Sequence, residues 1–189
     1  MTAPSTSNEF DRVYRGLFTP WGDVRIPLEL KQLLSTEQPQ SSLELGCGLG
    51  RFSLHLAERG VAATAVDFSA VAIERARQRA ASHARRPEFL VGDVTNLNAL
   101  NGPFDVSFDV GCFHCLGAEQ QLAYAAEVAR LLRPNGTHLL WALDVAPCAL
   151  RLSPASVAQA FAPYFELREA RKSRRRLASS HWYWLVRRA

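Results

Sequence analysis

Three glycines at alternate positions form the clearest chemical signal in the chain. They lie in Glu44-Leu45-Gly46-Cys47-Gly48-Leu49-Gly50, after a short apolar run and before a helical pattern. Glycine lets a backbone approach a ligand closely, and the N-terminus of a following helix favours anionic groups. Several classes of nucleotide-binding protein share such a loop, so it predicts a nucleotide-like ligand without choosing among the classes.

Acidic residues mark the ends of the next two predicted strands. Asp67 follows the glycine loop at the distance where an acid in such folds accepts hydrogen bonds from ribose hydroxyls. Phe68 comes next and could lie against a purine ring. Asp93, in Gly92-Asp93-Val94, could accept a hydrogen bond from an exocyclic amino group. Together the three strand ends predict a site for an adenosine ligand without a 2′-phosphate.

The elements that must position these residues alternate from residue 42 onward. The sequence predicts helices at 51–59, 69–82 and 118–132, and strands at 42–45, 61–66, 88–91, 104–110 and 137–143. This alternation predicts an α/β fold with a mostly parallel sheet and helices on both faces. Arg133-Pro134-Asn135-Gly136 should form the turn that ends the third of these helices.

Both ends of the chain depart from this rhythm. A helix at 154–161 precedes aromatic-rich strands at 165–170 and 181–186, which should pair antiparallel because no helix joins them. The first 40 residues lack a strong period, so we expect loop and one or two helices packed over the top of the domain. We therefore expect a single domain, 1–189, made of an N-terminal lid segment (1–40), a cofactor-binding core (41–145) and a C-terminal helix with its strand pair (146–189).

The composition excludes several classes of protein. A chain of 189 residues with 48% hydrophobic residues has room for one ordinary core, and it contains no run of about 20 apolar residues that could cross a membrane. The polar N-terminus has no secretion signal, so we expect a cytoplasmic protein with free thiols. Cys112 and Cys115 form a C-x-x-C, but no second pair completes a zinc set, and we expect no metal site.

The basic charge is concentrated near the C-terminus. Residues 165–189 hold eight Lys and Arg against two Glu, in a chain of net charge +4. The run Arg171 to Arg176 could attract nucleic acid, but it lies between two predicted strands, where charged residues commonly cover a turn or an exposed sheet edge. The position favours the structural explanation.

The residues described so far resemble those of the class I S-adenosylmethionine-dependent methyltransferases. Glu44 to Gly50 match the family's glycine motif, Asp67 its ribose acid and Asp93 its adenine-loop acid, over roughly residues 40 to 145. The resemblance implies a single Rossmann-like, doubly wound, seven-stranded sheet with one antiparallel strand. It also implies S-adenosyl-L-methionine as the cofactor and S-adenosyl-L-homocysteine as the product. The glycine spacing, which is not G-x-G-x-x-G, argues against a dehydrogenase.

A narrower resemblance extends to the small bacterial thiopurine, thiocyanate and tellurite-resistance type methyltransferases, which act on small molecules. It is carried by Tyr14-Arg15-Gly16 with Pro20-Trp21, by Asp109 to His114 and by Ser180 to Leu185. That group often has Asp-Arg-Gly where this chain has Asp109-Val110-Gly111, which implies a changed substrate contact.

These resemblances extend the predicted site beyond the strand ends. We expect the cofactor to contact Tyr14, Trp21, Glu44, Gly46, Cys47, Gly48, Gly50, Arg51, Asp67, Phe68, Asp93, Val94 and Asp109. Tyr14 and Trp21 would cover the sulfonium, although Trp21 could instead anchor the N-terminal segment. Asp109 would face the methionine amino group, or else orient His114.

Methyl transfer from a sulfonium is an in-line displacement, so much of its acceleration comes from orienting the two partners. A sulfur, selenium or tellurium acceptor needs little help from a base, whereas a hydroxyl or protonated amine must lose a proton. His114, just past the fourth strand, is the candidate base or substrate contact, and it could equally be a packing residue. The narrower resemblance and the absence of any other well-placed base in the sequence lead us to expect a soft acceptor.

Two other functions fit the cofactor residues. The first is an RNA or DNA methyltransferase, which only the basic run favours. Against it, the fourth strand is not followed by the Asn/Asp-Pro-Pro-aromatic sequence that is typical of many such enzymes. A catalytically silent, cofactor-binding partner protein is the other alternative. We expect a small-molecule acceptor, in a pocket lined by the N-terminal segment and the loops after strands four and five. The sequence does not fix an oligomeric state.

Overall fold

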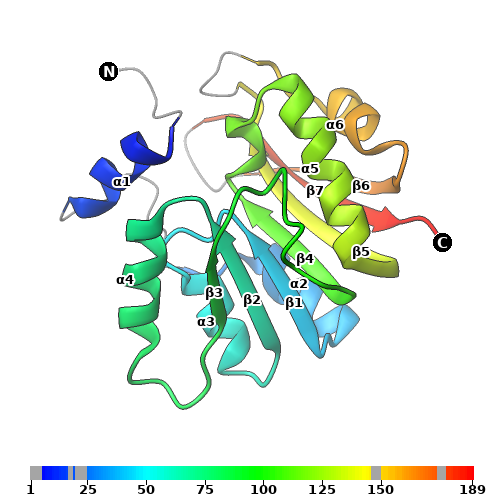
Figure 1. Cartoon of the computed structure of the whole chain (residues 1–189). Coiled ribbons are helices and arrows are strands. Elements are labelled where there is room, and N and C mark those ends of the chain that lie inside the picture. Colours follow the sequence, from blue (N-terminus) through cyan, green and yellow to red (C-terminus); the bar gives the residue numbers. More distant parts are fainter. Residues whose placement is uncertain (1–5, 17–18, 20–24, 146–149, 174–177) are drawn as a thin grey trace.

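Seven strands lie side by side in one sheet, in the order β3-β2-β1-β4-β5-β7-β6 (Figure 1), within the residues that the computed structural model describes: 6–16, 19, 25–145, 150–173 and 178–189. The strands are β1 (Ser41–Leu45), β2 (Ala62–Asp67), β3 (Glu88–Val91), β4 (Phe104–Val110), β5 (Leu132–Leu143), β6 (Phe165–Lys172) and β7 (Ser180–Arg187). β7 runs in the direction opposite to that of the other six strands. The predicted α/β fold with an antiparallel C-terminal pair is confirmed.

The direction of the strand order reverses beside β1. From β1 the chain adds β2 and β3 on one side, then returns to add β4 and β5 on the other. Leu45, the last residue of β1, pairs with Val66 on one side and with Asp109 on the other. The loops after β1, β2 and β4 therefore leave the sheet at the same edge, where ligands bind in open α/β sheets.

Helices cover both faces of the sheet (Figure 1). The helices α2 (Leu28–Glu37), α3 (Arg51–Ala57) and α4 (Ala70–Ala80) pack on one face, and α5 (Ala118–Leu131) and α6 (Pro154–Phe161) on the other. Alternation along β5 supplies both cores, since Trp141 joins the α2 and α3 side while Leu140 joins the α5 and α6 side. None of the described helices is both long and apolar enough to cross a membrane.

The two N-terminal helices lie in different places. α2 buries Leu30 and Leu33 against the sheet face rather than over its ligand edge, which differs from the expected packing over the top of the domain. The helix α1 (Ser7–Arg15) lies beside α4, away from the body of the sheet (Figure 1). An amphipathic stripe, with Leu30 and Leu33 on one side of α2, explains why this helix joins the core.

The turn expected at Arg133 to Gly136 lies inside β5. Leu132 pairs with Phe104, and the next pair joins Thr137 to Val106, so more residues of β5 than of β4 occupy this stretch. The excess chain bulges at Asn135, which has a φ of 60°. The helix ends before this stretch as predicted, but the strand begins at Leu132 and not at Thr137, because Leu132 already pairs with Phe104.

Candidate active site

The glycine loop leaves β1 with positive φ angles, 68° at Gly46 and 52° at Gly48. A Cβ atom at Gly46 would collide with the side chain of Cys112, and one at Gly48 would lie 2.8 Å from the Tyr14 hydroxyl. Neighbouring protein atoms therefore already exclude side chains here, whereas the sequence pattern suggested only a close approach of ligand. Burial raises the pKa of the Cys112 thiol, in agreement with a packing role.

Asp67 ends β2 beside this loop, and its carboxylate is almost fully buried. One oxygen accepts a hydrogen bond from Gly48 N at 2.8 Å, and the other accepts one from Ser69 N at 2.9 Å. Burial raises the pKa of Asp67, while these two amides oppose that rise. A carboxylate can accept about four hydrogen bonds, so each oxygen keeps capacity for another donor. This donor requirement fits the two hydroxyls of a ribose.

Asp93 and Phe68 lie on the adjoining loops. Asp93 is exposed, and one of its oxygens accepts hydrogen bonds from Thr95 N at 2.9 Å and Thr95 Oγ1 at 2.7 Å. Phe68 is 38% exposed, and its ring meets Phe10 of α1 edge-on, with 5.0 Å between centroids. The ring of Phe68 and the second carboxylate oxygen of Asp93 thus lie on the loops where the sequence predicted that adenine binds. Val94, between them and the core, is buried.

Glu44 points into the protein. Its carboxyl group accepts a hydrogen bond from Ser53 N at 2.9 Å and contacts Ser53 Oγ more closely still. Ser53 belongs to the first turn of α3, so Glu44 satisfies an amide that a helix N-terminus leaves free. Burial raises the pKa of Glu44 to about 8. The side chain therefore holds α3, which begins at Arg51, in place behind the glycine loop.

Asp109 is fully buried at the end of β4 and holds the next loop. It accepts four hydrogen bonds, at 2.7 to 3.0 Å, from Gly111 N, Cys112 N, Phe113 N and Tyr124 Oη. Burial raises its pKa to about 6, against the effect of these donors. Four donors saturate the carboxylate. The geometry therefore favours a loop-holding role over the expected contact with the methionine amino group.

A buried polar network behind Asp109 was not predicted. Tyr124 Oη also lies 3.3 Å from His138 Nε2, and His138 Nδ1 lies 2.9 Å from Ser107 Oγ. Burial lowers the pKa of His138 to about 3, so the ring is neutral and bridges the two hydroxyls. The available signal was a histidine in the apolar stretch 137–143, a position where a buried polar group needs partners.

His114 lies in a short 3₁₀ turn, η1 (Phe113–Cys115), and is 6% exposed. Its Nδ1 accepts a hydrogen bond from Leu143 N at 3.3 Å, and its ring stands edge-on to Trp141. Since Nδ1 accepts, a neutral His114 ring carries its hydrogen on Nε2. This tautomer donates from Nε2, whereas a general base would need a lone pair there.

A second histidine lies at the same edge, and sequence reasoning missed it. His181, at the start of β7, has its Nδ1 2.6 Å from Oδ1 of Asp144, the residue after β5. The two positions are 37 residues apart, and only the antiparallel register of β5 and β7 brings them together. The signal was an acid directly after a strand and a histidine at the start of the strand that pairs with it.

Comparison with known proteins decides the family. A profile described as a methyltransferase domain matches residues 43–136, which contain the glycine loop, Asp67, Asp93 and Asp109. The chain belongs to the class I S-adenosylmethionine-dependent methyltransferases.

Individual relatives of this methyltransferase are distant. The 2-heptyl-1-hydroxyquinolin-4(1H)-one methyltransferase of Mycobacteroides abscessus is 28% identical over 129 residues, which are 67% of this chain and 57% of that enzyme. The match thus spans little more than half of the relative's length.

Solved structures share the fold of this methyltransferase over nearly its whole length. N-methyltransferase NodS of Bradyrhizobium japonicum, in complex with S-adenosyl-L-homocysteine, has a TM-score of 0.81 at 19% identity, covering 97% of this chain and 99% of that one. A TehB-like methyltransferase of Corynebacterium glutamicum has a TM-score of 0.74 at 17% identity, covering 96% and 98%. At sequence identities this low, the similarity supports a shared fold and nothing further.

The helix α1 of the methyltransferase is fastened to α4 beside the glycine loop. Asp11 accepts hydrogen bonds from Ser69 Oγ and, at 3.4 Å, from Val71 N. Arg75 of α4 donates in return to the carbonyls of Tyr14 and Gly16. Ser69 also contacts Asp67, so α1 is linked to the predicted ribose acid. Trp21, the other expected aromatic cover, lies outside the described residues.

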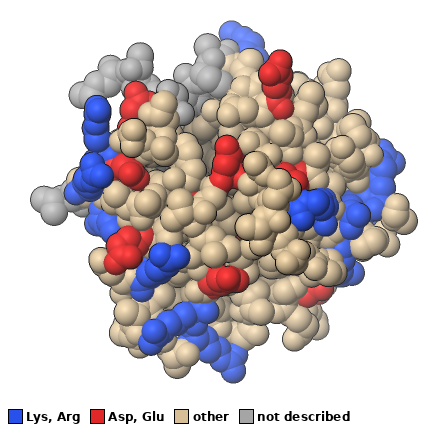
Figure 2. Space-filling view, viewed as in Figure 1, with Lys and Arg blue, Asp and Glu red and all other residues tan. Residues whose placement is uncertain are grey.

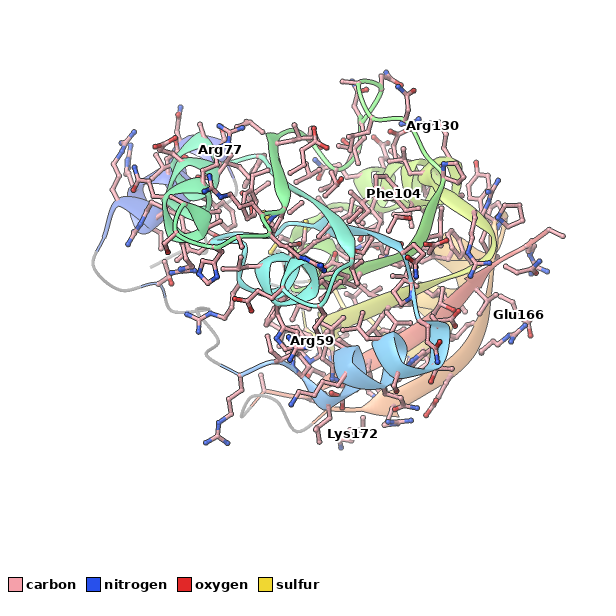
Figure 3. All side chains as sticks on the ribbon, turned by 90° about the horizontal axis from the view of Figure 1, so that it is seen from below. Arg59, Arg77, Phe104, Arg130, Glu166 and Lys172 are labelled. Carbon is pink, nitrogen blue, oxygen red and sulfur yellow. The ribbon has the colours of Figure 1, made fainter. Side chains whose placement is uncertain are left out.

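The basic C-terminal stretch of the methyltransferase includes the edge strand β6, whose two ends are marked by Glu166 and Lys172 (Figure 3). Arg171 pairs with Glu169 at 2.8 Å and stacks 4.7 Å above the ring of Trp184. On the face shown in Figure 2, basic and acidic side chains are interspersed. The exposed, mixed-charge strand agrees with the expected sheet edge; Arg174, Arg175 and Arg176 lie outside the described residues.

Proposed function

We propose that this protein transfers the methyl group of S-adenosyl-L-methionine to a small-molecule acceptor. The observation that carries the proposal is Asp67, a buried carboxylate with capacity for two further donors, at the end of β2 beside the glycine loop. The Mycobacteroides abscessus relative is named for a hydroxyquinolone, which supports an acceptor of that size.

Residues of three loops would hold the cofactor. Asp67 would bind the ribose hydroxyls, Asp93 would accept from the adenine amino group, and Phe68 would lie against the adenine ring. The loop from Gly46 to Gly50, with Cys47 and the first residue of α3, Arg51, would lie along the methionine half. Glu44 and Val94 would contribute through their backbones, because their side chains are buried in the protein.

The cofactor supplies an activated methyl group, so the protein's main task is to bind the two reactants, orient them and exclude water. Holding two reactants in alignment can contribute about 7 to 11 kcal/mol to the lowering of the barrier. Tyr14, whose hydroxyl lies against Gly48, and the helix α1 around it would form the lid. Asp109 would contribute by fixing the loop that carries His114.

The acceptor would lie beyond β4, over the loops that follow β4 and β5. His114 borders this region, and its tautomer suits donation to an acceptor atom with a lone pair. We therefore propose His114 as a substrate contact, in preference to the general base considered from the sequence.

The proposal is tested by titrating S-adenosyl-L-homocysteine into the wild type and Asp67→Asn in a calorimeter. Charge-assisted hydrogen bonds are worth about 1.5 to 3 kcal/mol, so the dissociation constant should rise at least about tenfold in the variant. Glu166→Gln, an exposed change on β6, serves as the control. Unchanged affinity in Asp67→Asn would remove the ribose assignment, and a wild type that binds no cofactor would overturn the proposed function.

A methyl-transfer screen then tests the acceptor class. Purified protein is offered thiols, metalloid oxyanions, heterocyclic nitrogens, phenols and RNA. Methylation of a small molecule is the expected result, whereas methylation of RNA alone would favour the nucleic-acid alternative. Tight binding of cofactor with no transfer to any class would favour the silent-partner alternative.

A further inference from the structure

We infer that His181, held by Asp144, is the general base of the reaction, and that the acceptor is therefore a hydroxyl or N–H group that loses a proton as it is methylated. This inference rests on the proposed methyl transfer and narrows it. It also replaces the expectation of a soft acceptor, which rested on the narrower resemblance and on there being no second well-placed base.

The first support is the geometry of the pair. The 2.6 Å distance between His181 Nδ1 and Asp144 Oδ1 places a hydrogen between them, so the neutral ring has its lone pair on Nε2. This is the opposite tautomer to that of His114. A carboxylate in this position also stabilises the imidazolium that forms when Nε2 takes a proton.

The second support is that hydrogen bonds from neighbouring residues hold Asp144 in place. Ser179 Oγ donates to the other oxygen of Asp144, Asp144 N donates to the carbonyl of Ser179 at 2.9 Å, and Leu152 N donates to the carbonyl of Asp144 at 2.8 Å. The two paired side chains are 23% and 20% exposed, which leaves them accessible to a ligand but largely desolvated. A fixed, partly buried carboxylate holds an imidazole far better than a mobile one on the surface.

The third support is the position of His181 in the sheet. It pairs with Ala142, while Leu140 pairs with Asp109, so His181 lies at the level of Gly111 and of the loop carrying His114. β7 is two strands from β4, or about 10 Å at ordinary strand spacing. His181 therefore lies at the carboxyl edge of the sheet, where an acceptor over the ends of β5 and β7 could contact it.

Among the residues that the structure describes, the charged and titratable groups around His181 come from three places in the fold. Asp144 follows β5, Lys172 lies opposite His181 on β6, and Tyr183 lies on β7 with its ring centroid 5.9 Å from that of His181. Burial and the nearby Asp144 carboxylate raise the pKa of the Tyr183 hydroxyl, which has no hydrogen-bond partner among the described residues. A buried, unpaired donor beside the pair is what an acceptor-binding site would need.

The proton balance of the step is simple. The acceptor's proton passes to His181 Nε2 while the acceptor's lone pair forms the new bond to the methyl carbon. The carbon–sulfur bond breaks with its electron pair left on sulfur, giving the neutral thioether product. The imidazolium then returns its proton to water, so no oxidant, reductant or metal is required.

The chain contains a matched control for this pair. His83 lies 2.8 Å from Glu58 in the same Nδ1-to-carboxylate arrangement, but it follows the C-terminal end of α4, at the opposite edge of the sheet from the glycine loop. His83→Gln removes an equivalent histidine–carboxylate pair without touching the proposed site. Asp144→Asn keeps His181 but removes the charge that fixes its tautomer.

The first experiment uses substituted phenols as probe acceptors, with cofactor affinity measured separately by calorimetry. His181→Gln should lower kcat by about 10²- to 10⁴-fold for phenols that are protonated at the assay pH. It should change kcat much less for nitrophenols that are already ionised, and it should leave the dissociation constant of S-adenosyl-L-homocysteine unchanged. Asp144→Asn should follow the same pattern, added imidazole should partly rescue His181→Ala, and His83→Gln should behave as wild type.

The second experiment needs no turnover. In protein labelled with ¹⁵N-histidine, NMR should show His181 with a protonated Nδ1 and an unprotonated Nε2, and this pattern should be lost in Asp144→Asn. The inference is overturned if His181 carries its proton on Nε2, or if a folded His181→Gln methylates every acceptor as fast as wild type. It is also overturned if the protein methylates only thiols or metalloids. A wild type that binds no S-adenosyl-L-homocysteine would instead overturn the proposed function.

Discussion

At the scale of single residues, the ligand edge is built on buried carboxyl groups whose neighbours decide their roles. Asp67 has two amide donors and room for more, whereas Asp109 has four donors and is saturated. The side chain of Glu44 accepts a hydrogen bond from the first turn of α3. In each case burial raises the pKa, so folding costs free energy when the group is ionised.

Glu44 gives a pH dependence of stability that can be measured. Its pKa rises from 4.5 to about 8 on folding. The folded state therefore binds this proton more tightly than the unfolded state does. The stabilisation that comes from protonation of Glu44 is complete below pH 4.5 and is lost as the pH rises to 8. Glu44→Gln should flatten the fall in unfolding free energy between pH 5 and 8, by at most about 1.4 kcal/mol per pH unit.

Urea denaturation at several pH values tests this prediction. Glu166→Gln, at an exposed position on β6, should keep the wild-type slope. A Glu44→Gln protein with the wild-type pH profile would mean that Glu44 is ionised in the folded state.

Residue type and strand position together pointed to Asp67, Phe68 and Asp93, since each lies at the end of a recognisable strand or within two residues of it. They did not predict that four donors surround Asp109, because three of those donors are backbone amides of a loop whose shape is set by tertiary contacts. The pair of His181 and Asp144 depends on strand register, which local sequence does not specify.

At the scale of elements, α1 is the helix that we propose as the lid. Its described contacts with the rest of the protein include Asp11 and Arg75 as hydrogen-bonding groups and Phe10 as an apolar one. A helix fastened at the cofactor edge in this way is a candidate lid.

Loosening α1 should therefore change cofactor exchange. Arg75→Ala removes the hydrogen bonds to the carbonyls of Tyr14 and Gly16, and we expect S-adenosyl-L-homocysteine to dissociate faster, on the order of tenfold. Stopped-flow displacement measures this rate. Arg12→Ala, an exposed change on the same helix, should leave it unaltered.

Hydrogen exchange over residues 10–16 provides the independent measurement. Exchange in the wild type should slow when S-adenosyl-L-homocysteine binds, and Arg75→Ala should reduce that protection. If the exchange rates were the same with and without cofactor, α1 would be a fixed anchor and not a lid.

Most elements were predictable because their patterns are local. β3, β4 and α6 begin and end at the expected residues. The errors arose where distant contacts decide the outcome: α2 joins the sheet face through Leu30 and Leu33, and pairing with Phe104 draws Leu132 into β5.

At the scale of the whole molecule, the concentration of basic residues near the C-terminus allows a test of nucleic-acid binding. If the basic run covers only a sheet edge, replacing Arg174, Arg175 and Arg176 with Ser should leave methyl transfer to a small acceptor intact. RNA affinity should be weak and steeply salt-dependent in the wild type. Fluorescence anisotropy with labelled RNA measures it, and tight binding at physiological salt, lost in the triple variant, would contradict this prediction.

The reversal of strand order beside β1 divides the ligand edge between two sets of loops. Those after β1, β2 and β3 carry the groups proposed for the cofactor, and those after β4 and β5, with the start of β7, carry the two imidazoles proposed for the acceptor. New acceptor chemistry can thus arise by mutation on one side while the costly adenosine-binding half is inherited unchanged. The architecture makes substrate choice evolvable, and it offers the protein engineer a boundary along which to exchange loops between distant members of the family.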